Sequence, residues 1–558
     1  MTSPKVLIIG LDAATPRLVE KWVSEGRLPT IARFLEDGAF GPLRSVPNRN
    51  SAPAWSTMVT GTNPGKHGIF WFTEDNPETY DYKFVNGSFR RTKAFWRVLS
   101  DEGQRVGIVN VPLTFPAEEV NGVFVGGLDS PSTDDPRFTY PPELREEVIA
   151  AAGGEYHITP ALAKYMIADQ VEEGLERLHR AADKRAAVAK HLMTTREWDA
   201  FMVVFTETDV VQHFFWKQME DPEPGTPEHH KTAVRDTYEH CDRIAADLIE
   251  AAGPDTLVIL VSDHGARFDD GLARAIPSWL EQLGLLAYKE EKANRSIKAR
   301  AQGVVAKTFR QLDKRLSPEA KHRLARRFPW ARSRVEVMMS FAKVDWSRTK
   351  AYTDGKRPEI WINLKGRQNQ GIVEPADYDK VRDEIIAAVE SAVNANTGEP
   401  LCRKVWKREE AYSGPYVERS PDLVIEWLDA GPCLDVRQAD GRVFHLEKRH
   451  LPDDPFDKLL NGGHDQFGIV GLLGDGVKPG RIEGADIADI GPTVLYIRDA
   501  PIPADVDGKP LAGALTFDRG AKQGDTAQAA PTSDADTEYS ADEEAEIHER
   551  LQALGYVE

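Results

Sequence analysis

Short apolar runs that end in polar residues recur along the first half of the chain. The clearest lie at residues 5–11, 201–205 and 257–261, where nearly every side chain is apolar. Weaker runs lie at residues 105–110 and 122–125. Strands that are apolar on both faces are typical of parallel sheets covered by helices. The pattern therefore predicts a buried, largely parallel sheet.

Between these runs, apolar residues recur at the spacing of amphipathic helices. Such patterns cover residues 15–25, 165–195 and 232–252, and a shorter one covers residues 29–35. Strands that alternate with helices indicate an α/β fold. We therefore expect a three-layer α/β/α sandwich.

The pattern changes after the first half of the chain and returns near its end. Residues 276–440 are expected to form a cap inserted between the two parts of the core, residues 1–275 and 441–512. Residues 513–540 are small and polar, which predicts a disordered linker. Residues 541–558 follow as an amphipathic helix that docks on the body or on a partner.

Charge is distributed unevenly. The whole chain has a net charge of −19 and a pI near 5.3, which argues against a nucleic-acid-binding protein. Residues 289–334 are the exception, with 15 Lys and Arg against 4 Asp and Glu. This basic segment has two interpretations. A solvated helical hairpin is slightly favoured; the alternative is a basic face that attracts an anionic substrate, a partner or a membrane surface.

Length and cysteine content restrict the class of protein further. A chain of 558 residues can bury a large core and form more than one domain. Three scattered cysteines give neither a disulfide framework nor a zinc-finger spacing. The apolar run at residues 6–9 is too short for a signal peptide or a membrane span. We expect a cytoplasmic protein, and homo-oligomerisation is left open.

Carboxylates and imidazoles follow the ends of several predicted strands. Open α/β sheets place their ligands at the carboxyl ends of the strands, so these side chains are expected to converge. Each has an ordinary interpretation as a cap, a turn or an exposed helix pair, but together they suit two divalent ions of the Zn²⁺ or Mn²⁺ type. The set contains Asp12, Asp209, His213, Asp263, His264 and His464.

A polar stretch at residues 50–68, interrupted by Gly and Pro, carries a hydroxyl at Ser51. Taken alone, it is better explained as a polar surface loop. Beside the six Asp and His residues, Ser51 becomes a candidate nucleophile. A helix that begins within residues 56–60 would point backbone N–H groups at a bound phosphate.

These motifs, in this order, resemble the alkaline phosphatase superfamily in its type I phosphodiesterase/nucleotide pyrophosphatase branch. Within that superfamily the chain is most similar to predicted phosphohydrolase/phosphomutase-like proteins. The resemblance covers most of residues 5–511. It rests on Gly10-Leu11-Asp12, residues 51–69, Asp209-x-x-x-His213, Ser262-Asp263-His264-Gly265 and Gly463-His464.

The resemblance implies metal-dependent hydrolysis of a small phosphate ester through a phosphoseryl intermediate on Ser51. It also implies two metal sites, with Zn²⁺ favoured and Mn²⁺ as the alternative. The first ion would be held by Asp209, His213 and His464, and the second by Asp12, Asp263 and His264. The second ion would lower the pKa of the Ser51 hydroxyl.

The chain departs from the pattern of the branch at two positions. The nucleophile there is usually Thr, and here it is Ser51. The branch also carries an Asn that contacts a phosphate oxygen, 21 residues past the nucleophile, where this chain has Phe72. Asn48, Asn50, Lys66 and Asn76 are the candidates to replace that donor. We mark Asn50, Lys66 and Phe72 as candidate substrate-binding residues.

Several alternatives stay open from sequence alone. Trp55 stands where a sulfatase has Arg, so sulfatase chemistry is disfavoured. The aromatic run at residues 70–72 and the cap favour a substrate with a sizeable second substituent, hence a phosphodiester or a nucleotide-type substrate. A phosphomonoesterase or a phosphotransferase would use the same site. A non-catalytic scaffold would instead use the basic segment and the C-terminal helix.

Overall fold

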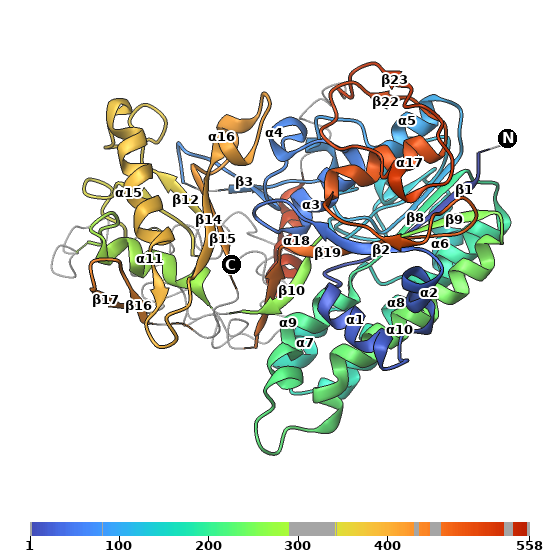
Figure 1. Cartoon of the computed structure of the whole chain (residues 1–558), viewed down its shortest axis with the longest axis horizontal. Helices are drawn as coiled ribbons and strands as arrows, with labels where there is room; N and C mark the ends of the chain where they lie inside the picture. Colours follow the sequence, from blue (N-terminus) through green and yellow to red (C-terminus); the bar gives the residue numbers. More distant parts are fainter. Residues whose placement is uncertain are drawn as a thin grey trace.

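The computed structural model describes residues 3–289, 341–428, 433–446, 459–528 and 539–554, apart from the single positions 81, 270, 342, 356 and 434. Within these residues a ten-stranded mixed sheet forms the centre of the protein (Figure 1). All the strands predicted above are present in its parallel part. In sheet order these are β9 (Thr256–Val261), β1 (Lys5–Leu11), β8 (Ala200–Phe205), β5 (Val106–Val109) and β6 (Gly122–Val125).

Antiparallel strands extend the sheet on both sides. β19 (Phe467–Leu473) pairs antiparallel with β9 and with β2 (Ala39–Arg44), while β7 (Thr139–Tyr140) pairs antiparallel with β6. Two short strands, β20 (Gly480–Arg481) and β21 (Ala485–Asp486), then run parallel to β2. The C-terminal part of the chain therefore returns to complete the sheet that the N-terminal part begins.

Both faces of the sheet are buried, which explains its continuous apolar runs. Along β1, Leu7 and Ile9 enter one core cluster, while Val6 and Ile8 enter another on the opposite face. On the first face lie α1 (Pro16–Ser24), α2 (Pro29–Glu36), α8 (Val171–Thr195), α9 (Glu207–Glu220) and α10 (Glu228–Ala252). On the second lie α3 (Ser51–Thr60), α5 (Phe95–Asp101) and α17 (Ile490–Ile497). The predicted α/β/α sandwich is confirmed.

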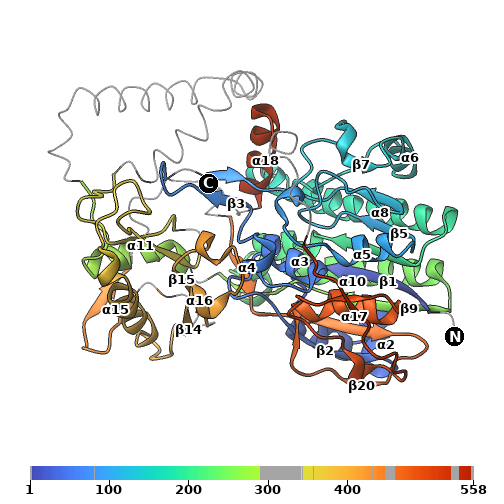
Figure 2. The same cartoon turned by 90° about the horizontal axis from the view of Figure 1, so that it is seen from above.

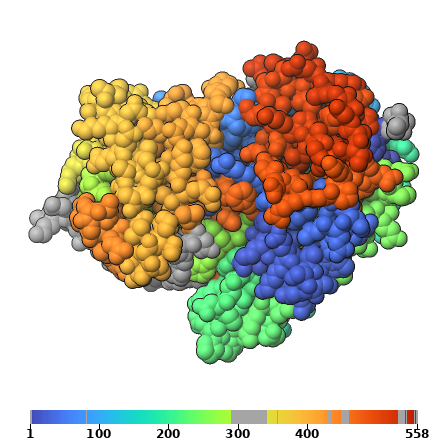
Figure 3. All heavy atoms as spheres, viewed as in Figure 1, coloured from blue at the N-terminus to red at the C-terminus, as the bar shows by residue number. Residues whose placement is uncertain are grey.

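A separate apolar cluster runs from Leu272 to Leu446. It is built on an antiparallel sheet of β11 (Ala351–Tyr352), β12 (Glu359–Ile362), β15 (Leu423–Trp427) and β14 (Cys402–Lys407), with α11 (Leu272–Gln282) and α15 (Tyr378–Glu390) packed against it. We call this the cap unit. The cap unit lies beside the sandwich in two perpendicular views (Figures 1 and 2). In the space-filling view the two units are in contact on the side that faces the reader (Figure 3).

The expectation of disorder from residue 513 onward is wrong for residues 513–528. There β23 (Gln523–Gly524) pairs with β22 (Ile502–Pro503), and the carbonyl of the fully buried Ala527 accepts a hydrogen bond from the Lys93 amide. Backbone pairing orders a segment whose composition alone is too polar to predict it. Residues 529–538, and the basic segment apart from residue 289, lie outside the described residues.

The C-terminal helix α18 (Ala541–Ala553) forms as predicted and packs on the body. It begins at a capping box made by Ser540 and Glu543. Its residues Ile547 and Leu551 enter the same core cluster as α8, and Arg550 donates to the carbonyls of Leu128, Ser130 and Pro131. No helix in the described ranges combines the length and apolarity that crossing a membrane requires.

Candidate active site

Ser51 is the first residue of helix α3. Asn50 caps this helix, because its Oδ1 accepts a hydrogen bond from the Ala52 amide at 3.1 Å. Pro53 fits in the first turn, where backbone N–H groups have no intrahelical partner. The expected helix start at residues 56–60 is therefore wrong. The helix begins at the candidate nucleophile itself and directs its N-terminal N–H groups toward that hydroxyl.

The structure brings the six predicted Asp and His ligands together at the carboxyl ends of the parallel strands. Asp12 follows β1, and Asp263 and His264 follow β9, whereas Asp209 and His213 lie one turn apart on α9. His464 was expected in a glycine-rich loop. It lies instead in the short strand β18 (Gly462–Asp465), which pairs with β10 (Gly265–Phe268).

Two overlapping groups of these side chains have the spacing of metal ligands. The ligand atoms of Asp209, His264 and His464 lie within 4.8 Å of one another, as do those of Asp12, Asp263 and His264. His213 completes the first group, with its Nε2 3.2 Å from Asp209 Oδ1 and 3.1 Å from His464 Nε2. The Ser51 Oγ lies 3.0 Å from His264 Nε2, so the hydroxyl borders both groups.

Backbone carbonyls orient all three imidazoles of the cluster. His213 Nδ1 lies 2.8 Å from the Gly462 oxygen, His264 Nδ1 3.0 Å from the Gly265 oxygen, and His464 Nδ1 2.7 Å from the Arg49 oxygen. A carbonyl only accepts, so each Nδ1 carries the hydrogen and donates it. Each Nε2 is then unprotonated in the neutral ring and turned toward the carboxylates, which is the arrangement of metal-ligating histidines.

The buried carboxylates of Asp12 and Asp263 crowd one another and are incompletely hydrogen-bonded within the described residues, an arrangement that suits the binding of a divalent cation. The buried Asp12 Oδ1 and Asp263 Oδ2 accept no hydrogen bond from the described residues. Burial, together with the neighbouring carboxylates, raises the pKa of Asp12 well above its usual range, and burial raises the pKa of Asp263 to about 7. Unsatisfied, crowded carboxylates in an apolar interior are costly unless a cation balances them. The donor set of three Asp and three His suits Zn²⁺ or Mn²⁺.

Asp209 has the opposite electrostatic environment. Burial acts to raise its pKa, but the imidazoles of His213 and His464 outweigh that effect and hold the pKa well below its ordinary range. Burial lowers the pKa of His264 well below its ordinary value, helped by the neighbouring His464. The cluster is therefore arranged around an ionised Asp209 and a neutral His264.

Of the three substrate-binding candidates, the structure brings only Asn50 to the site. Asn50 is fully buried, lines the cavity beside His213 and His464, and its Nδ2 finds no acceptor among the described residues. Lys66 lies in α4 (Pro64–His67), beyond the opposite end of α3, where it pairs with Asp507. Phe72 is buried in the hydrophobic core, with 1% of its surface exposed. The structure therefore does not bring Lys66 or Phe72 to the lining of the cavity.

Of the other two asparagines considered as donors, Asn48 has its amide nitrogen engaged, and Asn76 is exposed and lies outside the lining of the cavity. Asn48 Nδ2 donates to the Phe70 carbonyl at 2.7 Å and to Glu359 Oε1 at 3.0 Å. Asn76 Oδ1 accepts from the Glu78 amide in a surface turn. Asn50 is thus the candidate that faces the cavity with its amide nitrogen.

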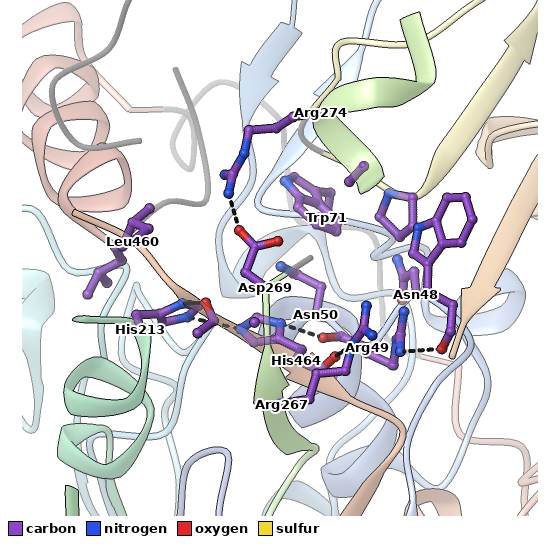
Figure 4. Close-up of a pocket in the computed structure, with 16 residues that line it drawn as sticks. Asn48, Arg49, Asn50, Trp71, His213, Arg267, Asp269, Arg274, Leu460 and His464 are labelled. Atoms are coloured by element: carbon purple, nitrogen blue, oxygen red, sulfur yellow. Dashed lines mark hydrogen bonds and ion pairs between the residues drawn. The ribbon is translucent and has the colours of Figure 1, made fainter. Parts of the chain in front are cut away.

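The cavity beside the cluster has a volume of about 130 Å³ and is lined by arginines that sequence reasoning missed (Figure 4). They are Arg49 from the loop before α3, Arg267 from β10 and Arg274 from α11. No spacing rule distinguishes them from the other arginines of the chain. The one available signal was the position of Arg49, two residues before Ser51.

A serine at a helix start, surrounded by buried Asp and His at strand ends of an α/β/α sandwich, defines a phosphohydrolase. Residues 6–431 match the family model described as type I phosphodiesterase/nucleotide pyrophosphatase. This match spans more than half of the chain, and the protein belongs to that family. The resemblance drawn from the motifs is thereby confirmed, and the protein is an enzyme of phosphate-ester hydrolysis.

Two enzymes are among the solved structures to which the chain is similar. Phosphonoacetate hydrolase from Sinorhizobium meliloti 1021, in complex with phosphonoformate, is 15% identical; 89% of this chain and 96% of that chain are covered, with a TM-score of 0.49. Human ectonucleotide pyrophosphatase/phosphodiesterase 5 is 12% identical, with 92% and 100% covered and a TM-score of 0.47. No curated protein matches the chain. The family assignment rests on the family model.

Proposed function

We propose that the protein hydrolyses phosphodiesters, including nucleotide-type substrates, through a phosphoseryl intermediate on Ser51. The observation that carries this proposal is the position of the Ser51 hydroxyl, at the start of α3 and 3.0 Å from His264 Nε2. The description of the family supports the preference for diesters. A phosphomonoesterase or phosphotransferase on the same site is the alternative. We place the enzyme in the cytoplasm, with a small-molecule substrate.

Six side chains of the cluster would hold two divalent ions. Asp209, His213 and His464 would bind one, and Asp12, Asp263 and His264 the other. Bound there, the ions would lower the pKa of the Ser51 hydroxyl and offset charge on the phosphate. The protein contributes the fixed geometry, because carbonyls orient the imidazoles and α9 sets the spacing of Asp209 and His213.

Ser51 is positioned for attack by its helix. Its Oγ would form the new bond to phosphorus while the bond to the leaving alcohol breaks, and water would later cleave the phosphoseryl ester. The first turn of α3 favours the negative charge of the phosphate. Asn50 Nδ2 would donate to a non-bridging phosphate oxygen, the role that the family's asparagine plays at the position of Phe72.

The test compares the wild-type protein with two serine variants of the same helix. With Zn²⁺ or Mn²⁺ present, the wild type should hydrolyse bis-p-nitrophenyl phosphate faster than p-nitrophenyl phosphate, and Ser51→Ala should hydrolyse neither. Ser56→Ala is the matched control, because Ser56 is equally buried but donates to the Ala52 carbonyl one turn away. Equal rates for the wild type and Ser51→Ala would contradict the proposal, and a preference for the monoester would support the alternative.

A further inference from the structure

Helix α18 reaches the cavity beside the Asp and His cluster at its carboxyl end. Leu554, the residue that ends this helix, lines the cavity together with His213 and His464. Leu460 lines it as well and lies next to His213 (Figure 4). The C-terminal part of the chain therefore gives the cavity an apolar section of wall beside its polar one.

Leu554 belongs to the face by which α18 packs on the sandwich. Ile547, Leu551 and Leu554 recur at the spacing of one helix face, and all three enter the core cluster. Their exposed fractions are 1%, 2% and 7%, respectively. Of these three described residues, Leu554 alone lines the cavity. Its side chain therefore borders two environments, the packed core and the space next to the reaction centre.

Polar contacts hold α18 on the body at both ends. Just before the helix, the Tyr539 hydroxyl donates to the Asp129 carbonyl at 2.6 Å. In the last turn, Arg550 donates from Nη1 to the Leu128 carbonyl at 2.9 Å. Contacts at both ends restrict the movement of the helix on the core, so Leu554 has a fixed position in the wall.

The polar and apolar sections of the wall suit different parts of a phosphate ester. Asn50, His213 and His464 face the cavity with groups of the kind that bind metal ions or phosphate oxygens. A phosphate gains nothing from contact with Leu460 or Leu554, whereas an apolar substituent is stabilised by leaving water there. Closely packed side chains yield little, so the same wall excludes a substituent that is too large.

We propose that Leu554 is a specificity-determining residue that limits the size of the substituent accepted beside the phosphate. The substrate is then a phosphate ester whose organic group is compact and has an apolar face. The match to the family model ends at residue 431, before α18 begins, so family membership assigns no role to this helix. The inference rests on the proposed function, since it assumes that the phosphate binds at Ser51.

The test uses methylphosphonate, phenylphosphonate and naphthylphosphonate, which differ only in the organic group on phosphorus. Their affinities for the Zn²⁺-loaded protein are measured by calorimetric titration, which needs no turnover. The wild type should bind phenylphosphonate more tightly than methylphosphonate, because the ring packs against the apolar wall. It should bind naphthylphosphonate less tightly than phenylphosphonate, because the wall excludes the second ring.

Two substitutions of Leu554 should change these affinities in opposite directions. Leu554→Trp fills part of the cavity, and it should weaken the binding of phenylphosphonate by about 10-fold relative to methylphosphonate. Leu554→Ala widens the cavity, and it should improve the binding of naphthylphosphonate by a similar factor relative to phenylphosphonate. Wild-type ratios in Leu554→Ala would overturn the inference, even where Leu554→Trp does not fold.

Leu551→Ala is the matched control. It removes the same atoms from the same helix face, but from a residue that is buried in the core and does not line the cavity. It should therefore leave both affinity ratios at their wild-type values. Ratios that shift equally in Leu551→Ala and Leu554→Ala would also overturn the inference, because the docking of α18 rather than contact with Leu554 would then set the preference.

Failure of this inference is distinguishable from failure of the proposed function. A protein that binds phosphonates but turns over no phosphate ester would refute the proposed function, and the affinity ratios would still decide the role of Leu554. An active wild type whose ratios neither substitution changes would refute that role and leave the phosphohydrolase standing. If methylphosphonate itself does not bind, the phosphate site is refuted and this inference with it.

Discussion

The side chain of Asn50 performs two separable tasks, and substitution can distinguish them. Its Oδ1 caps α3 at the Ala52 amide, while its Nδ2 faces the cavity beside Ser51. Asn50→Ala removes both groups. Asn50→Ser keeps an oxygen that caps a helix but lacks the amide nitrogen. The pair of variants therefore separates helix stability from phosphate binding.

The expected magnitudes differ enough to be measured. Loss of a helix cap costs about 1 kcal/mol of stability, so Asn50→Ala should lower the free energy of unfolding in urea by that amount and Asn50→Ser by only a few tenths. Loss of a preorganised donor to a transition-state oxyanion costs about 100-fold to 1,000-fold in kcat. Both variants should therefore lose activity on bis-p-nitrophenyl phosphate to a similar extent, although only one loses stability.

The kinetic and the thermodynamic results test different statements. An Asn50→Ser variant that retains wild-type kcat would refute Asn50 as the phosphate donor. Equal loss of stability in both variants would instead refute the capping argument.

Further predictions concern metals, a buried ion pair and pH. Chelation should abolish hydrolysis, and Zn²⁺ or Mn²⁺ should restore it; activity that survives exhaustive chelation would contradict the proposed role of the six ligands. Arg185 and Glu207 are both fully buried and 2.7 Å apart, so Arg185→Met should cost about 3 to 5 kcal/mol in denaturant unfolding by leaving a buried charge, while Arg185→Met with Glu207→Leu should recover much of it. No recovery in the double variant would show that the pair is needed for packing. His67 is fully buried, and burial, with the nearby Arg90, lowers its pKa to about 3 from 6.5. The folded protein favours the neutral form of His67, so the contribution of His67 to stability is complete above pH 6.5 and falls by about 1.4 kcal/mol per pH unit toward pH 3. His67→Gln should therefore reduce the loss of unfolding free energy, measured in urea, as the pH falls through this range. An unchanged loss would refute this assignment.

The sandwich can be predicted from sequence because its central strands are buried on both faces. Val6 to Ile9 alternate between two cores, so these four successive positions of β1 must all be apolar. That requirement leaves a strong signal. Segments ordered by backbone pairing leave none, which is why residues 513–528 read as disordered although β23 pairs with β22.

The start of α3 shows the limit of reading helices from side-chain pattern. Residues 51–53 read as a polar loop, yet they form its first turn, because Asn50 caps the backbone and Pro53 needs no amide there. Here local hydrogen bonding decides the structure rather than apolar spacing. Because the helix begins at Ser51, its first backbone N–H groups lie beside that residue.

The candidate site also contains residues that can be predicted from sequence and residues that cannot. The Asp and His cluster can be predicted because these residue types stand at the ends of apolar strands, and strand ends meet in space. Arg267 and Arg274 carry no such signal, since only tertiary packing of β10 and the cap unit brings them to one cavity. Lys66 was a candidate to replace the phosphate donor, but the length of α3 separates it from Ser51.

The most direct test of the central claim is to trap the covalent intermediate. Acid quenching of the metal-loaded enzyme during turnover of bis-p-nitrophenyl phosphate, followed by peptide mass spectrometry, should find a nitrophenyl phosphoryl group on the peptide that contains Ser51. Fragmentation should place it on the Ser51 oxygen, and the Ser56→Ala control should give the same adduct. A turning-over enzyme that carries no adduct, or carries it on another residue, would contradict the account.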